Sequence, residues 1–137
     1  MFLNLLTERQ KQSFLALATK VVMADGAVVP EEHVMLNVRV AEMGGGIKAP
    51  PEEIYGEPNF AVFDTQCARI IVLLELMVIA YSDGEYHEDE RPIIRQLAEK
   101  FEIGEADMAQ FEDWAKRQSP LSVEGWGFMV KAGLIGD

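Results

Sequence analysis

The chain has 137 residues, of which 49% are hydrophobic, and its formal net charge is −11. This length and composition indicate a single globular domain, residues 1–137, with enough apolar side chains for a hydrophobic core. The negative charge argues against nucleic acid or an anionic membrane surface as a partner, because both would repel the protein.

The single cysteine and the start of the chain bear on the cellular compartment. Cys67 adjoins an apolar run, so we expect a buried, unreactive thiol in a reducing compartment. Residues 1–6 have neither the basic start nor the length of a signal peptide. Residues 67–81 contain two charged side chains and are shorter than the roughly 20 apolar residues that cross a bilayer. We therefore expect a cytoplasmic protein with no membrane-inserted segment.

The first predicted helix follows Thr7, whose hydroxyl is suited to cap it, and runs to about Met23. Leu3, Leu5 and Leu6 are expected to pack against its start. Helical spacing gives this helix one buried stripe, formed by Phe14, Leu15, Leu17, Ala18, Val21 and Val22.

The second predicted helix begins at Pro30, a residue suited to the first helical position, and runs to about Met43. Glu31 and Glu32 suit its first turn, near the positive end of the helix dipole. Three consecutive glycines then end it. Residues 47–60 contain three prolines and predict a connection with at most one helical turn, around residues 52–55. Such an extended connection could present a surface to a protein partner.

The third predicted helix is capped by Asp64 or Thr65 and is apolar on nearly all sides between residues 70 and 81. A helix of this kind is expected to be buried on most sides, at the centre of the fold. Glu75 is its one acidic residue, and two interpretations of it are open. It is either a buried functional acid or, as we favour, the partner of a basic side chain, for which the candidates are Arg39, Arg69 and Arg95.

Three further helices are predicted in the last third of the chain. Residues 88–90, all acidic, open the fourth helix, and its expected buried residues are Ile93, Ile94, Leu97, Ala98 and Phe101. The fifth, about Glu105 to Arg117, is expected to bury Met108, Phe111 and Trp114.

Ser119 and Pro120 together form a cap followed by a first-position proline, so a sixth helix is expected from about Pro120 to Ala132, ending at Gly133. Its large apolar residues have two interpretations, as core residues or as the interface of a homodimer. These residues are Trp126, Phe128 and Met129.

An internal repeat relates the first two helices to the third and fourth. Asp25–Gly26 and Asp83–Gly84 are 58 residues apart, and so are Glu32 and Glu90. The sequence thus predicts an all-α fold of about six helices built on two helix–acidic turn–helix repeats. Both glycines are expected at positive φ, where a helix stops and turns. We also expect the two turns to pair antiparallel through Val28 and Tyr86.

The spacing of Asp, Gly and Glu in each turn equals the second half of a calcium-binding EF-hand loop. The first half is missing, because apolar residues and one tyrosine occupy the positions that should carry oxygen ligands. These residues are Val21 and Met23 in the first copy, and Ile79 and Tyr81 in the second. A true EF-hand is therefore not expected.

The two turns together predict a divalent-cation site. Calcium, magnesium and manganese prefer carboxylate and carbonyl oxygens, and two adjacent turns could pool them. Zinc is disfavoured because His33 and His87 do not match in the repeat. In the alternative interpretation, each Asp caps its own turn, each Glu meets a helix dipole, and no metal is bound. The candidate metal ligands are Asp25, Glu31, Glu32, Asp83, Asp89 and Glu90.

The repeat resembles the TerB-like family, named for a tellurite-resistance protein. The matching residues are Ala24–Asp25–Gly26 with Glu31–Glu32, and Ser82–Asp83–Gly84 with Asp89–Glu90, within about residues 10–117. The resemblance implies a small all-helical protein of the response to tellurite or other chemical stress. It also implies metal binding by the acidic residues and recognition of protein partners. The alternative is a metal-free protein–protein interaction module, like the related domain preceding the J domain in a membrane-anchored co-chaperone.

Enzyme signatures do not occur in the sequence. There is no Gly-x-Ser-x-Gly motif, no His-Glu-x-x-His motif and no cysteine–histidine spacing typical of a nucleophile with its base. We therefore expect a protein that acts by binding and not by catalysis.

Overall fold

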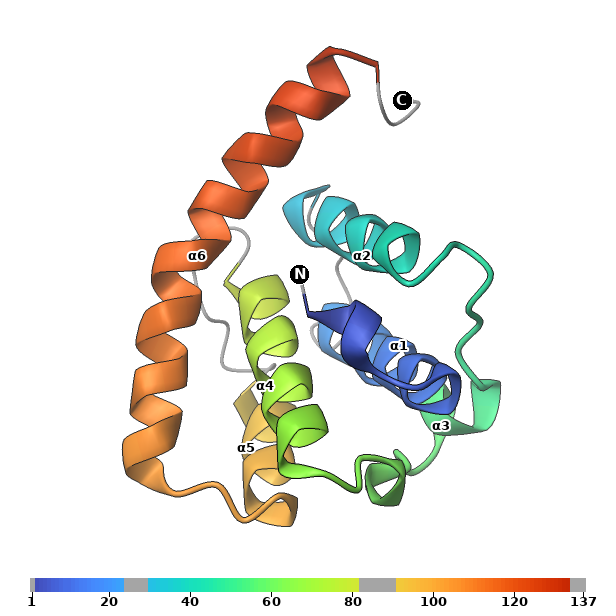
Figure 1. Ribbon diagram of the computed structural model, residues 1–137, viewed down its shortest axis with the longest axis vertical. Helices are drawn as coiled ribbons and strands as arrows, with labels where there is room; N and C mark the ends of the chain where they lie inside the picture. Colours follow the sequence, from blue (N-terminus) through green and yellow to red (C-terminus); the bar gives the residue numbers. More distant parts are fainter. Residues whose placement is uncertain (1, 24–29, 82–90, 134–137) are drawn as a thin grey trace.

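The structure is a computed structural model that describes residues 2–23, 30–81 and 91–133, with the backbone alone at residues 30–34 and 91. Its regular elements, over those ranges, are all helical, which confirms the all-α prediction (Figure 1). In chain order they are η1 (Leu3–Leu5), α1 (Glu8–Met23), α2 (Pro30–Glu42), α3 (Pro51–Tyr55), η2 (Phe60–Val62), α4 (Gln66–Ala80), α5 (Arg91–Lys100) and α6 (Glu105–Lys131).

Helix α4 lies at the centre of the fold and contacts α1, α2, α5, α6 and η1 (Figure 1). Its residues are buried on nearly every side, as its apolar sequence predicts, and fully burying one aliphatic side chain contributes about 1.5–3 kcal/mol. The fully buried residues of α4 are Val72, Leu73, Leu76, Met77, Ile79 and Ala80.

Helix α1 begins with a reciprocal cap. The Thr7 hydroxyl accepts a hydrogen bond from the Gln10 backbone N–H at 3.2 Å, and the Gln10 side-chain oxygen accepts one from the Thr7 N–H at 3.0 Å. Both bonds satisfy amides that the first helical turn leaves without partners, so the predicted cap is confirmed. The predicted stripe of six apolar residues is also buried. Leu5 differs from the prediction: it is 65% exposed, because η1 turns Leu3 inward and Leu5 outward.

Glycine ends helix α2 where the sequence predicts. Gly44 and Gly45 have φ of 102° and 78°, a left-handed conformation that side chains disfavour. The Gly45 N–H donates to the Val40 carbonyl at 3.0 Å, which closes the last turn. Beyond the glycines, α3 is the single helical turn predicted within the connection.

Helix α4 is capped by Thr65, one of the two predicted residues, whose hydroxyl accepts a hydrogen bond from the Ala68 N–H at 3.1 Å. The prediction for Cys67 is wrong: the side chain is exposed. Cys67 and Ala68 are neighbours in the first helical turn, so when Ala68 faces the core its neighbour points about 100° away.

The last two predicted helices are one continuous helix, α6, with Pro120 inside it. Ser119 does not cap a new helix. Its buried hydroxyl donates to the Val78 carbonyl of α4 at 2.7 Å, so a tertiary hydrogen bond holds this point of α6 against the core. That anchor helps to offset the roughly 3 kcal/mol cost of an interior proline. The helix ends near Gly133, at φ 86°, as predicted.

The packing of α5 agrees with prediction better than that of α6. Ile94, Leu97, Ala98 and Phe101 are buried, and Ile93 is partly buried. The predicted buried residues of α6 before Pro120 are only partly buried.

Beyond Pro120, α6 extends past the other helices (Figure 1). Phe128 and Met129 are exposed there, so their interpretation as core residues is wrong. No helix within the described ranges has the length and apolar character that crossing a membrane requires.

Candidate functional site

The six predicted metal ligands fall where the structure gives no side chains. Asp25, Asp83, Asp89 and Glu90 lie outside the described residues, and so do the side chains of Glu31 and Glu32. The backbone places the latter two directly after Pro30, in the first turn of α2, as predicted. The predictions about Gly26 and Gly84, the pairing of Val28 with Tyr86, and the His33 and His87 side chains also lie outside the described residues.

The described helices that flank the two acidic segments pack against one another. Helix α1 contacts both α2 and α4, and α4 contacts α5. Elsewhere in the described part of the chain, no group of three His, Cys, Asp or Glu residues could hold a metal ion.

Glu75 forms the predicted ion pair, and its partner is Arg39. The Arg39 Nη2 lies 2.8 Å from the Glu75 Oε1, and the two side chains are 4% and 1% exposed. The other carboxylate oxygen, Oε2, accepts a hydrogen bond from the Phe2 backbone N–H at 2.9 Å. Because a buried charge requires compensation, this carboxylate joins α2, α4 and the start of the chain.

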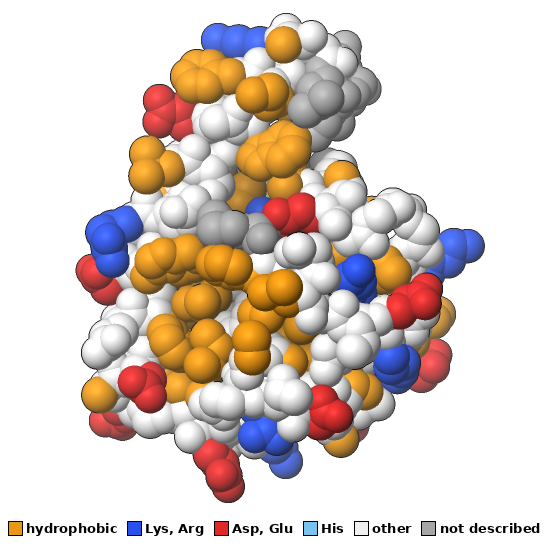
Figure 2. Space-filling model, viewed as in Figure 1, with side chains coloured by type: hydrophobic (Ala, Val, Ile, Leu, Met, Phe, Trp, Pro, Cys, Tyr) orange, Lys and Arg blue, Asp and Glu red, His pale blue; other side chains and the backbone are white. Residues whose placement is uncertain are grey.

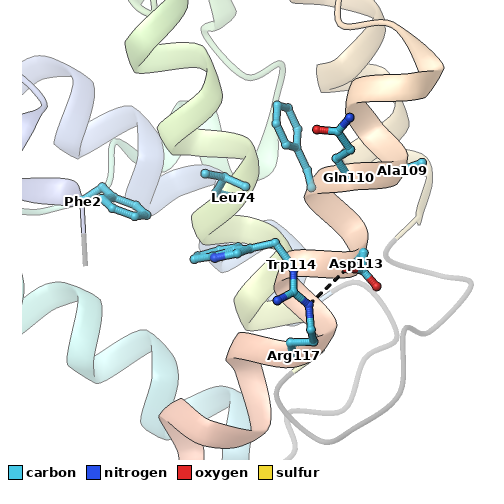
Figure 3. Close-up of a pocket in the computed structure, with 8 residues that line it drawn as sticks. Phe2, Leu74, Ala109, Gln110, Asp113, Trp114 and Arg117 are labelled. Atoms are coloured by element: carbon cyan, nitrogen blue, oxygen red, sulfur yellow. Dashed lines mark hydrogen bonds and ion pairs between the residues drawn. The ribbon is translucent and has the colours of Figure 1, made fainter.

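The Phe2 bond positions one wall of an open apolar groove, which we call the α4–α6 groove. It has a volume of about 680 Å³ and lies between the start of the chain, α4 and α6 (Figure 3). The ring of Phe2 lies 6.1 Å from that of Trp114, centroid to centroid. Its lining residues are Phe2, Leu74, Ala109, Gln110, Phe111, Asp113, Trp114 and Arg117.

The surface around the groove is largely apolar, with charge at its rim. Figure 2 shows hydrophobic side chains gathered on this face of the molecule and again on the part of α6 that extends beyond the bundle. At the rim, the Arg117 Nε donates to the Asp113 Oδ2 at 3.1 Å, and both side chains are about 70% exposed. The groove therefore suits an apolar or aromatic side chain better than a charged ligand.

Sequence reasoning missed the groove, because it arises from residues far apart in the chain. The spacing of Phe111 and Trp114 predicted burial in α6, but nothing indicated that Phe2 would lie opposite Trp114. It also missed a polar cluster between α1 and α3. There the Arg9 Nη2 donates a hydrogen bond to the Glu53 Oε2 at 2.7 Å, and the Ser13 hydroxyl donates one to the Glu53 Oε1 at 2.8 Å.

Comparison with known proteins gives one family. Residues 61–113 match the model of the family described as "Tellurite resistance protein TerB". The matched segment contains α4, the second acidic segment of the sequence, α5 and the start of α6. No curated protein and no solved structure matches the chain. The resemblance to the TerB-like family is thereby confirmed, and residues 61–113 carry it.

Proposed function

We propose that this protein acts by binding and not by catalysis, in the response to tellurite or other chemical stress. Its ligand is a divalent cation held by the two acidic Asp–Gly turns. The observation that carries this proposal is the extent of the TerB match, which includes the whole second turn with Asp83, Asp89 and Glu90.

The charge of the chain supports a cation as the ligand. The six candidate ligands lie in two short segments of a protein whose formal net charge is −11, and clustered carboxylates repel one another unless a counter-ion is present. Calcium, magnesium or manganese would accept such oxygen ligands.

Thermal unfolding with added calcium, magnesium, manganese or zinc, and with a chelator, tests the cation. A cation that binds only the native state, present at about one hundred times its dissociation constant, stabilises the fold by about 2.7 kcal/mol. The double variant Asp83→Asn/Glu90→Gln keeps the shape of the side chains and should lose this stabilisation. The matched control, Asp113→Asn/Glu124→Gln, removes two carboxylates of α6 and should keep it. A wild-type midpoint that ignores every cation would refute the cation site.

Survival of cells exposed to tellurite tests the biological role. Cells that express the wild type should tolerate more tellurite than cells that express the Asp83→Asn/Glu90→Gln variant at an equal level. Equal survival of the two strains would show that tolerance of tellurite does not depend on these two carboxylates.

A second candidate function is a metal-free protein–protein interaction module, which the α4–α6 groove favours. Its apolar lining beside an exposed ion pair is typical of a site for a partner's side chain. This candidate predicts that no cation changes the melting curve. It also predicts that Trp114→Ala abolishes the survival of cells exposed to tellurite, whereas Asp83→Asn/Glu90→Gln leaves that survival intact. Trp114→Ala protein that melts near the wild-type temperature would show that the loss is not one of folding.

A further inference from the structure

The last part of α6, residues 120–131, which we call the α6 arm, touches the core only at its start, where Val123 is partly buried against it. None of its residues is buried, and Leu121, Phe128 and Met129 are 63%, 62% and 48% exposed. A helix of this length is marginally stable alone in water, and Gly125 and Gly127 each weaken it by about 1 kcal/mol. The arm therefore has both the apolar surface and the need for a packing partner.

The apolar residues of the arm continue the wall of the α4–α6 groove. Trp114, Leu121 and Phe128 are spaced seven residues apart in one continuous helix, so they share one face of it. Trp114 lines the groove, and the two others follow it along the exposed part of α6. The groove wall and the arm thus share one line of large apolar side chains along α6, which we call the strip: Trp114, Leu121 and Phe128.

We propose that two copies of this chain pair through this strip, with their α6 helices antiparallel about a two-fold axis at Leu121. Leu121 then meets its counterpart in the second copy. Trp114 and Phe128 lie at equal distances on either side of the axis, about 10 Å along the helix. Each Phe128 therefore reaches the groove of the other copy, beside Trp114, and the contact is the same in both directions.

The charges of the strip fit a second copy in the same arrangement. Arg117 and Glu124 lie on opposite sides of Leu121 at nearly equal distances, so each arginine lies beside a glutamate of the other chain. The charges that flank the strip along α6 sum to zero, unlike those of the chain as a whole. They belong to Asp113, Arg117, Glu124 and Lys131. Salt screens the interaction between charges that are more than about 10 Å apart. The acidic residues elsewhere on the two copies therefore repel one another only weakly when the copies meet at this strip.

The mass of the protein in solution tests the pairing. Sedimentation equilibrium in chelator, which removes any contribution from a bound cation, should show a concentration-dependent dimer for the wild type. Leu121→Glu places two like charges at the axis and should weaken association about a hundredfold or more. Tyr55→Glu, an equal change at a 79% exposed residue of α3, should leave association unchanged. A wild type that is monomeric at all concentrations would overturn the proposal and leave the groove to a different protein.

Charge exchange tests the antiparallel register. Arg117→Glu and Glu124→Arg should each weaken the dimer, and the double variant should recover most of the lost association, because it restores opposite charges across the axis. Failure of the double variant to recover would exclude this register.

Disulfide formation tests the axis itself. Leu121→Cys in a Cys67→Ser background should oxidise readily to a covalent dimer, while Gly127→Cys in the same background should not. Position 127 lies on another side of the helix, with open space around an added Cβ. Equal cross-linking at the two positions would refute an axis at Leu121.

Discussion

The two halves of α6 differ in what lies beside them, although both are rich in apolar residues. Before Pro120 the helix packs on α4, where Ala115 and Ser119 are fully buried. After Pro120 no residue of the helix is buried. The change coincides with the end of α4, because Ser119 bonds Val78, two residues before α4 ends at Ala80.

This difference shows that apolar character alone does not decide burial. The sequence of the α6 arm resembles that of a core helix, yet α4 is too short to cover it. The bundle and the arm should therefore respond differently to equivalent substitutions.

The largest effect is expected for Arg39→Ala. The variant leaves the Glu75 carboxylate buried without its guanidinium partner, which costs about 3–5 kcal/mol. Arg117→Ala removes the same kind of pair from the surface of α6, where both partners are exposed, and should cost less than about 0.5 kcal/mol. Urea unfolding measures both.

The double variant Arg39→Met/Glu75→Gln separates the lost charge from the lost packing. It removes both charges and keeps an acceptor for the Phe2 N–H, so it should recover most of the stability that Arg39→Ala loses. If it is as unstable as Arg39→Ala, the unpaired charge is not the cause.

Leucine truncation compares core with arm more directly. Leu76→Ala removes a fully buried side chain from α4 and should cost about 2–5 kcal/mol. Leu121→Ala removes one that is 63% exposed and should change stability by less than about 0.5 kcal/mol. The measurement is made at low protein concentration, so that association does not contribute. A large loss for Leu121→Ala in the monomer would mean that Leu121 itself packs on the bundle.

A smaller effect is expected at the hydrogen bond where the two halves meet. Ser119→Ala removes the donor to the Val78 carbonyl and should cost about 1–3 kcal/mol, because the bond is buried. Ser122→Ala, three residues further into the arm, removes only a partly buried acceptor for Gln118 and should be close to neutral. Equal losses would contradict the idea that Ser119 anchors the helix.

Local signals in the sequence predicted much of the fold. Thr7 and Thr65 cap the helices they were expected to cap, and Gly44 and Gly133 end α2 and α6. These signals act within a few residues, so the sequence contains them in full. The pairing of Glu75 with a basic residue was also predictable, because a lone acid in an apolar helix requires compensation.

The remaining features depend on contacts between distant segments. Pro120 follows a serine and therefore predicts the start of a helix, but the Ser119 hydroxyl bonds to α4 and the helix continues through the proline. Cys67 adjoins an apolar run and was therefore predicted to be buried, but the packing of α4 on its neighbours leaves it exposed. The groove requires Phe2 and Trp114 to meet, which no spacing in the sequence indicates. Of the candidate cation site, the described residues give only the backbone of Glu31 and Glu32 at the start of α2.

The smallest predicted effect concerns the helix of the arm itself. Gly127→Ala adds a methyl group in open space and replaces a weak helix former, so it should stabilise the arm by about 1 kcal/mol. Because no residue of the arm is buried, this gain should remain local. Hydrogen exchange should slow at the amides of residues 121–131, while the urea midpoint of the bundle stays unchanged. If the urea midpoint rises by an amount equivalent to the whole gain, the arm and the bundle unfold as one unit. The two halves of α6 would then differ in their packing but not in their stability.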